Sequence, residues 1–153
     1  MTYDRQLLKE ELKRDEEVRQ YPYSDGTGKP PILPPRADGK PSKLTIGCGW
    51  NLTDNGLPPI IIDQLLDIGI NQAALDVHAL LPEWENLSDA RQRVLLNLAF
   101  NMGRSTLGQF RIFLRAMQDG EFEAAAVALK DSRWFTQVGK ERSDHLLQKI
   151  REG

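Results

Sequence analysis

Cysteine is almost absent from this sequence, since Cys48 is the only one in 153 residues. A lone cysteine cannot form an internal disulfide, so oxidative cross-links play no part in the expected fold. Long apolar runs are also lacking: the longest candidate, from Leu57 to Ile70, is interrupted by prolines and aspartates. A membrane-spanning helix needs about 20 apolar residues. We therefore expect no stable association with a membrane.

The N-terminal stretch has no apolar segment of the kind found in secretory signals, and it is charged from the start. We expect the chain to stay in the cytoplasm where it is made unless another component releases it. An excess of basic charge is lacking too, with 20 basic and 22 acidic residues and a net charge of −2. Nucleic-acid binders normally carry a basic excess, so we expect no nucleic-acid partner. His78 and His145 have no partner arrangement for metal binding, and we expect no metal and no cofactor.

What is present has the composition of a soluble globular protein: 40% of residues are hydrophobic and 27% are charged. The length suits one domain, residues 1–153, and we expect a monomer. Apolar periodicity predicts an amphipathic helix over residues 4–21, with Leu8 and Leu12 on its apolar stripe and Pro22 ending it.

The second half of the chain has a helical pattern throughout. Ser88 is expected to cap one helix and Gly103 to follow its end. The expected segments are residues 60–68 and 72–81 (two helices, or one kinked at Gly69), 88–102, 110–117, 121–129 and 140–151.

Residues 23–50 have a different character. The segment from Gly26 to Leu44 holds five of the nine prolines and three glycines, which excludes a regular helix. The following run, Lys43–Trp50, predicts a strand. The fold class is thus α+β and mostly α. A small β-containing lobe near the N-terminus, about residues 15–55, adjoins a larger helical body, about 56–153, that packs with the N-terminal helix. A cleft between the two is the expected ligand site.

Glu16 follows Leu8 and Leu12 at intervals of four, so all three share one stripe of the expected helix. Burial disfavours the ionised form of a carboxyl group, which suits a general acid. Asp25 follows in a Tyr-Ser-Asp-Gly turn, where a carboxylate stays solvated. Glycoside hydrolysis uses such a pair, one to protonate the leaving oxygen and one to activate water. The plainer alternatives are an ion pair of Glu16 with a neighbour such as Arg19, and a simple turn role for Asp25.

The active-site region of T-even-phage-type lysozymes, an endolysin family also found in many prophages, resembles three motifs of this chain: Asp15-Glu16-x-x-Arg19, Tyr23-x-Asp25 and Thr45-Ile46-Gly47-x-Gly49. Four further segments resemble the helical body of that family and occur in the same order: Asn97 to Gly103, Phe110, Ala124-Ala125 and Ser132-Arg133-Trp134. The resemblance covers roughly residues 8–145. Its specificity comes from the ordered set of motifs and not from any single one.

The resemblance implies a lysozyme-like fold and a muramidase, which hydrolyses the β-1,4 bond between N-acetylmuramic acid and N-acetylglucosamine in bacterial peptidoglycan. Matched by position, Glu16 is the general acid, Asp25 the catalytic aspartate, and Thr45 the residue that helps to hold the attacking water. A threonine hydroxyl both donates and accepts, so it can orient a water beside Asp25. The implied reaction is inverting, which requires about 6.5–9.5 Å between the two carboxyl groups.

Four further positions match the family near the expected cleft. Asn101 and Phe110 are expected to contact substrate, Asn101 by binding a sugar amide; its alternative is a hydrogen bond at a helix end. Arg19 and Tyr23 are expected to support the site. Arg19 resembles an arginine that braces the junction of the lobes, and its expected partner is Glu16 or Asp25. Trp134 matches a buried core aromatic.

Two departures from the family affect the site. Residues 26–44 form a proline-rich insertion between Asp25 and Thr45, where the family has a much shorter connection. The insertion brings Asp38 closer to Thr45 in sequence, so Asp38 is the alternative catalytic aspartate; we prefer Asp25 because its spacing from Glu16 and the preceding tyrosine both match. The insertion itself is a lid, a specificity element or inert decoration. The second departure is Trp50, which stands where many relatives have a histidine.

Two other functions stay open at this point. A lytic transglycosylase acts on the same bond with a single glutamate and leaves an anhydro-sugar, whereas an aspartate and a threonine together favour a water nucleophile. A catalytically inactive protein that binds or builds the cell wall is the second alternative. For an endolysin, family analogy implies that a holin opens the route from the host cytoplasm to the periplasmic wall.

Overall fold

The structure is a computed structural model that describes residues 3–24, 27–132, 134–135 and 138–153. It contains two compact units, which we describe separately. The helical unit comprises Met1–Glu16 and Ile68–Gly153, and the loop unit comprises Glu17–Asp67. The expected class, α+β and mostly helical with a small β-region near the N-terminus, is confirmed.

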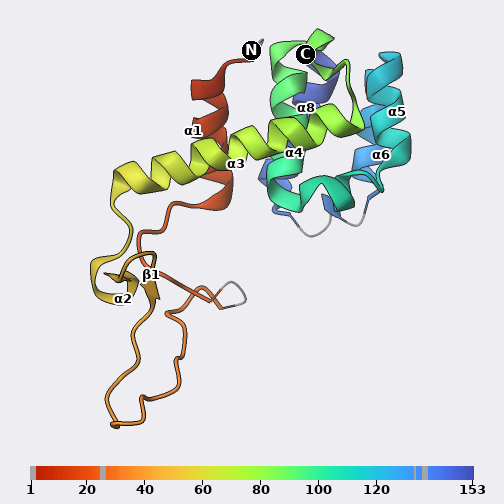
Figure 1. The fold of residues 1–153 in the computed structure, drawn as a ribbon. Helices are drawn as coiled ribbons and strands as arrows, with labels where there is room; N and C mark the ends of the chain where they lie inside the picture. Colours follow the sequence, from red (N-terminus) through yellow and green to blue (C-terminus); the bar gives the residue numbers. More distant parts are fainter. Residues whose placement is uncertain (1–2, 25–26, 133, 136–137) are drawn as a thin grey trace. The chain divides into compact units, whose positions relative to one another are not determined.

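The helical unit is built from helices that pack against one another in pairs: α1 contacts α4, α4 contacts α8, α8 contacts α6, and α6 contacts α5 (Figure 1). Their bounds are α1 Arg5–Glu16, α4 Asp89–Leu107, α5 Arg111–Asp119, α6 Phe122–Lys130 and α8 Lys140–Glu152, with a short 3-10 helix, η1, at Trp84–Asn86. Among the described helices, none is long and apolar enough to cross a membrane.

Apolar residues from all of these helices are buried in the helical unit. Leu8 and Leu12 of α1 are 0% and 1% exposed, as the apolar stripe predicts. The largest fully buried side chains of the other helices are those of Ile70, Leu95, Leu96, Leu98, Leu107, Phe113, Met117, Leu129 and Ile150. The packing of this core holds α1, α4 and α8 in place, and the polar side chains described below lie on these three helices.

The loop unit contains a two-stranded antiparallel sheet, β1 Thr45–Ile46 and β2 Trp50–Asn51, followed by the short helix α2 Leu52–Asn55. The prediction of one strand over residues 43–50 is therefore wrong: the run is a hairpin. Gly47 (φ 57°) and Gly49 (φ 95°) adopt backbone conformations that favour glycine, and they turn the chain back on itself. Asn51 caps α2 by accepting the Asp54 N–H at 3.1 Å.

The first helix is shorter than predicted. It was expected to continue to residue 21, and it ends at Glu16. The cause is the next residue, because Glu17 adopts the left-handed conformation (φ 56°) and cannot continue a right-handed helix. Glu16 is therefore the last residue of α1 and is more exposed than the leucines that precede it on the stripe.

The helix α3 spans Pro59–Leu80 without interruption, so the predicted break or kink at Gly69 is wrong. A Cβ atom on Gly69 would lie 2.5 Å from Cε2 of Phe100. The glycine is thus used for close packing of α3 against α4 and not for bending.

The remaining helix predictions agree with the structure to within a few residues. Ser88 caps α4 and accepts the Arg91 N–H at 3.4 Å. Gly103 has the positive φ expected of a residue at a helix end (71°), although one more helical turn follows it. The helices α5, α6 and α8 lie where periodicity places them. The short elements α2 and η1 were not predicted, because three or four residues show no periodicity.

Candidate functional site

Glu16 lies at the C-terminal end of α1, and α4 and α8 supply its partners. Its Oε1 atom accepts a hydrogen bond from Arg142 Nη2 at 2.7 Å and another from Asn101 Nδ2 at 3.2 Å. Both bonds use Oε1, so Oε2 accepts none from the described residues. The side chain is 36% exposed. The carboxyl group is thus held through one oxygen, and the side chain as a whole is partly exposed.

The neighbouring carboxylate, Asp15, is the more buried of the two, at 4% side-chain exposure. Asn97 Nδ2 donates to its Oδ2 at 3.0 Å, and Arg14 donates to its Oδ1. Arg142 Nε lies 3.7 Å from Asp15 Oδ2, while Arg142 Nη2 also donates to Asn97 Oδ1 at 2.9 Å. Arg142 therefore connects Asp15 and Glu16 through one guanidinium group. The resulting network balances two carboxylates against two guanidinium groups.

Asn101 continues this network into the core. Its Oδ1 accepts the indole N–H of Trp134 at 2.8 Å, which fixes the amide so that Nδ2 points to Glu16. Trp134 is 8% exposed, in line with the predicted buried aromatic. A buried tryptophan thus orients Asn101, and Asn101 helps to orient Glu16.

Sequence reasoning missed Arg142 and the bridging role of Asn97. Arg142 is 126 positions from Glu16 along the chain, so no local spacing connects them. Asn97 was noticed only as part of a longer motif, and its pairing with Asp15 and Arg142 follows from how α1, α4 and α8 pack. For Glu16, the expected arginine neighbour is present, but it is Arg142 and not Arg19.

Arg19 and Tyr23 belong to the loop unit and contact each other, with the guanidinium carbon 4.6 Å from the centre of the tyrosine ring. Arg19 also donates to Gly28 O at 2.9 Å and forms an ion pair with Glu17 at 2.7 Å. The hydrogen bond that Arg19 donates to the Glu17 carboxylate raises the pKa of the Arg19 guanidinium. These contacts hold the chain on both sides of the turn that the motif predicts to carry the aspartate. Asp25 itself lies outside the described residues.

Thr45 is an exposed residue of β1 and lies opposite Asn51 of β2. The alternative aspartate, Asp38, lies near the tip of the insertion. It accepts the Lys40 N–H at 3.2 Å and forms ion pairs with Arg36 Nε at 3.4 Å and Lys40 Nζ at 3.9 Å. These bonds connect Asp38 to neighbouring residues of the same turn and stabilise that turn.

Phe110 and Trp50 complete the set of residues singled out from the sequence. Phe110 lies at the N-terminus of α5, partly buried, and is not part of the Glu16 network. Trp50 of β2 is 44% exposed, and its indole N–H donates to Gly56 O at 2.8 Å. Trp50 therefore joins the hairpin to the end of α2.

In the part of the chain that the structure describes, no three His, Cys, Asp or Glu side chains gather in a group suited to a metal ion. His78 and His145 are exposed, as is the free Cys48. The arrangement around Glu16 holds its carboxyl group through Oε1, and a carboxyl group in this position can exchange a proton with a bound molecule.

No protein-family model matches the chain. It is 30% identical over 146 residues to the pre-baseplate central spike protein Gp5 of Enterobacteria phage T4, a match that covers 86% of this chain and 25% of that protein. It is 33% identical over 70 residues to the probable T4-type lysozyme 2 of Dictyostelium discoideum, covering 46% of this chain and 41% of that protein. The chain thus spans a quarter of the first relative and less than half of the second. The similarity supports a relation to lysozyme-like proteins without assigning a particular member.

Proposed function

We propose that the chain is a phage-type muramidase that hydrolyses the β-1,4 bond between N-acetylmuramic acid and N-acetylglucosamine in peptidoglycan. One observation carries the proposal most directly: Glu16 is held through Oε1 by Arg142 and Asn101, while Oε2 accepts no hydrogen bond from the residues that the structure describes. A general acid must be fixed in place and still reach the leaving oxygen, and these two hydrogen bonds supply the positioning. The relative named as a T4-type lysozyme supports the same reaction class.

In the proposed mechanism, Glu16 gives its proton to the glycosidic oxygen as the bond from that oxygen to C1 breaks. A water molecule attacks C1 from the opposite face, and Asp25 takes its proton. Thr45 orients this water by accepting from it or donating to it. The products are two shorter glycan strands, one of which carries a new reducing end with inverted configuration. Asn101 and Phe110 are assigned to substrate binding, and Arg19 and Tyr23 to the support of Asp25.

We place this activity in phage-induced lysis of the host, with the two units acting together as one lysozyme-like domain. The enzyme is made in the host cytoplasm, reaches the periplasmic wall after a holin opens the inner membrane, and works as a monomer. These parts of the proposal rest on the family resemblance.

The substitution Glu16→Gln tests the acid. It removes the transferable proton and keeps the shape of the side chain, so we expect lysis of outer-membrane-permeabilised bacteria to fall at least about 100-fold. Loss of turbidity is the measurement, with circular dichroism to confirm folding. The matched control is Glu10→Gln on the exposed face of the same helix, where Glu10 bonds to Gln6; it should keep full activity. A fully active Glu16→Gln enzyme would rule out the mechanism.

The two candidate aspartates are compared in the same assay. Asp25→Asn should abolish lysis, because the variant no longer takes the proton from water. Asp38→Asn should change the rate by less than about threefold, since Asp38 is engaged in its own turn with Arg36 and Lys40. The reverse result would assign the proton acceptor to Asp38.

A further inference from the structure

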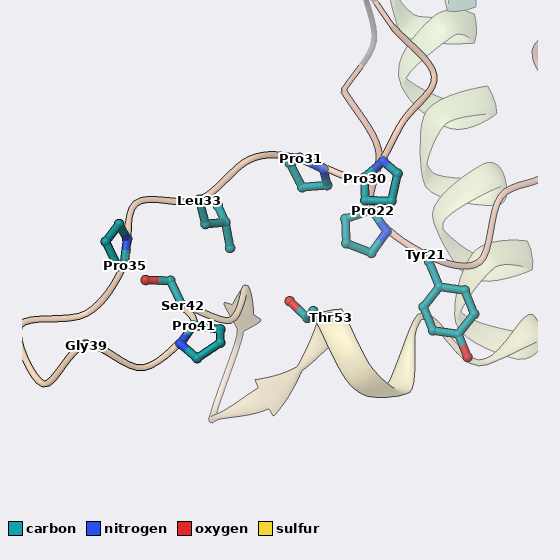
Figure 2. Close-up of a pocket in the computed structure, with 10 residues that line it drawn as sticks. All are labelled: Tyr21, Pro22, Pro30, Pro31, Leu33, Pro35, Gly39, Pro41, Ser42 and Thr53. Atoms are coloured by element: carbon teal, nitrogen blue, oxygen red, sulfur yellow. The ribbon is translucent and has the colours of Figure 1, made fainter.

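The insertion of the loop unit forms a pocket of about 570 Å³ (Figure 2). The two arms of the insertion form its walls, and Tyr21, Pro22 and Thr53 close it on the side away from the tip. Its volume lies in the range of small-molecule sites, about 300–1,000 Å³. The whole pocket belongs to the loop unit, so its shape depends on that unit alone.

The lining of this pocket is apolar and uncharged. Five of the ten lining residues are prolines, and none of the described residues that line it is charged. The side chain of Leu33 points into the space between the two arms (Figure 2). Such a lining favours ligands with apolar C–H faces and disfavours charged groups, because a charge would lose water there without gaining a partner.

Two hydroxyl groups give the pocket a small polar part. Thr53 Oγ1 accepts the Leu44 N–H at 2.7 Å, and among the described residues no acceptor takes its own proton. Thr53 is therefore able to donate to a ligand. Ser42 Oγ donates to Pro34 O, which leaves it able to accept. One donor and one acceptor match the C=O and the N–H of an acetamido group.

The pocket is also linked to the residue that precedes Thr45. Leu44 donates its N–H to Thr53 Oγ1, and Leu44 O accepts the Leu52 N–H at 2.8 Å. Leu44, which directly precedes β1, is thus hydrogen-bonded to Thr53 of the pocket wall. A ligand in the pocket would lie in the same unit as Thr45.

We propose that this pocket binds an N-acetylglucosamine ring of the glycan strand, outside the bond that is cleaved. This assignment rests on the proposed function, because it takes the glycan as substrate. In peptidoglycan the stem peptide, with its charged groups, is carried by N-acetylmuramic acid, whereas N-acetylglucosamine is neutral. The uncharged lining selects the neutral ring, and the two hydroxyl groups supply the donor and the acceptor that its acetamido group requires. The insertion is thereby a specificity element that favours longer strands.

Binding is tested on the full chain carrying Glu16→Gln, so that no sugar is cleaved. The protein is labelled at leucine methyl groups and titrated with the trimer of N-acetylglucosamine. We expect the Leu33 methyl signals to shift with sugar concentration and those of Leu98, buried in the helical unit, to stay. Unmoved Leu33 signals, or a response to free stem peptide and not to the trimer, would overturn the assignment.

A matched pair of variants tests the consequence for catalysis. Leu33→Asp puts a charge into the pocket and should raise KM for long glycan strands roughly fivefold while leaving kcat unchanged, which corresponds to about 1 kcal/mol of binding. Ile32→Asp puts the same charge on a neighbouring side chain that is 100% exposed, and KM should stay within about twofold. Equal KM values for the two variants would contradict the subsite. If the unsubstituted enzyme releases no reducing ends, the proposed function fails, and the methyl titration still decides whether the pocket binds the sugar.

Discussion

The two units of the molecule are stabilised in different ways. Every hydrophobic side chain that the structure describes as buried lies in the helical unit, and none lies in residues 17–67. The loop unit is instead held by backbone hydrogen bonds, some within turns, such as Gly39 N to Arg36 O at 2.9 Å, and some between distant segments, such as Leu57 N to Gln20 O at 2.8 Å. Glu16 belongs to the helical unit, which has a buried core, and Thr45 belongs to the loop unit, which is held by hydrogen bonds.

This difference suits the proposed division of labour. A general acid benefits from a rigid support, and the packed faces of α1, α4 and α8 supply one. Segments without a core tolerate insertions, and they commonly carry specificity. The proline-rich insertion lies in the unit where it disturbs no buried packing.

The largest expected effect compares apolar truncations in the two units. Leu98 is 0% exposed, so Leu98→Ala leaves a cavity and should lower the free energy of unfolding by about 3 kcal/mol. Leu44 is the partly buried residue before β1. Leu44→Ala should lower the free energy of unfolding by about 1 kcal/mol or less, because the backbone hydrogen bonds of this residue remain. Urea denaturation measures both. Equal losses would mean that the loop unit has a core comparable to that of the helical unit.

The second prediction concerns the buried charges of the helical unit. Glu11 of α1 forms ion pairs with Arg93 of α4 and Lys149 of α8, with side-chain exposures of 8%, 7% and 14%. Glu11→Gln leaves two cations without this partner, although Arg93 keeps Asp89. We expect a loss of about 2–3 kcal/mol in urea denaturation. The exposed neighbour variant Glu10→Gln should change stability by less than about 0.5 kcal/mol; a similar small change for Glu11→Gln would show that the ion pairs contribute little.

The smallest prediction concerns the N-terminus of α4. Ser88→Ala removes the acceptor of the Arg91 N–H and should cost about 1 kcal/mol in thermal or urea denaturation. Ser105→Ala, on the exposed side of the same helix, is the control and should have no measurable effect. An equal effect of the two variants would show that the Ser88 cap is not stabilising.

The sequence predicts the helical unit well because periodicity and caps are local signals. Leu8 and Leu12 mark the buried side of α1, and Ser88 marks the start of α4. The end of α1 was missed because Glu17, a residue that rarely adopts positive φ, ends the helix. Gly69 was misread because a glycine also serves for close packing, and the sequence does not show that Phe100 lies against it.

The candidate site was predictable only in part. Glu16, Asn101 and Trp134 were singled out by their motifs, and the structure joins them in one network. Arg142 was not found, because its contact with Glu16 depends on how α8 packs and no spacing encodes it. The pocket of the insertion was equally hidden, since runs of proline predict an irregular chain without showing what it encloses.

The central claim is tested most directly by the products that the enzyme releases from peptidoglycan in water enriched in oxygen-18. Mass spectrometry should show N-acetylmuramic acid reducing ends that carry one heavy oxygen, because water supplies the new hydroxyl group at C1. Anhydromuramyl ends without heavy oxygen would identify a lytic transglycosylase, and an undigested wall would show that the chain does not cleave it; either result would contradict the account.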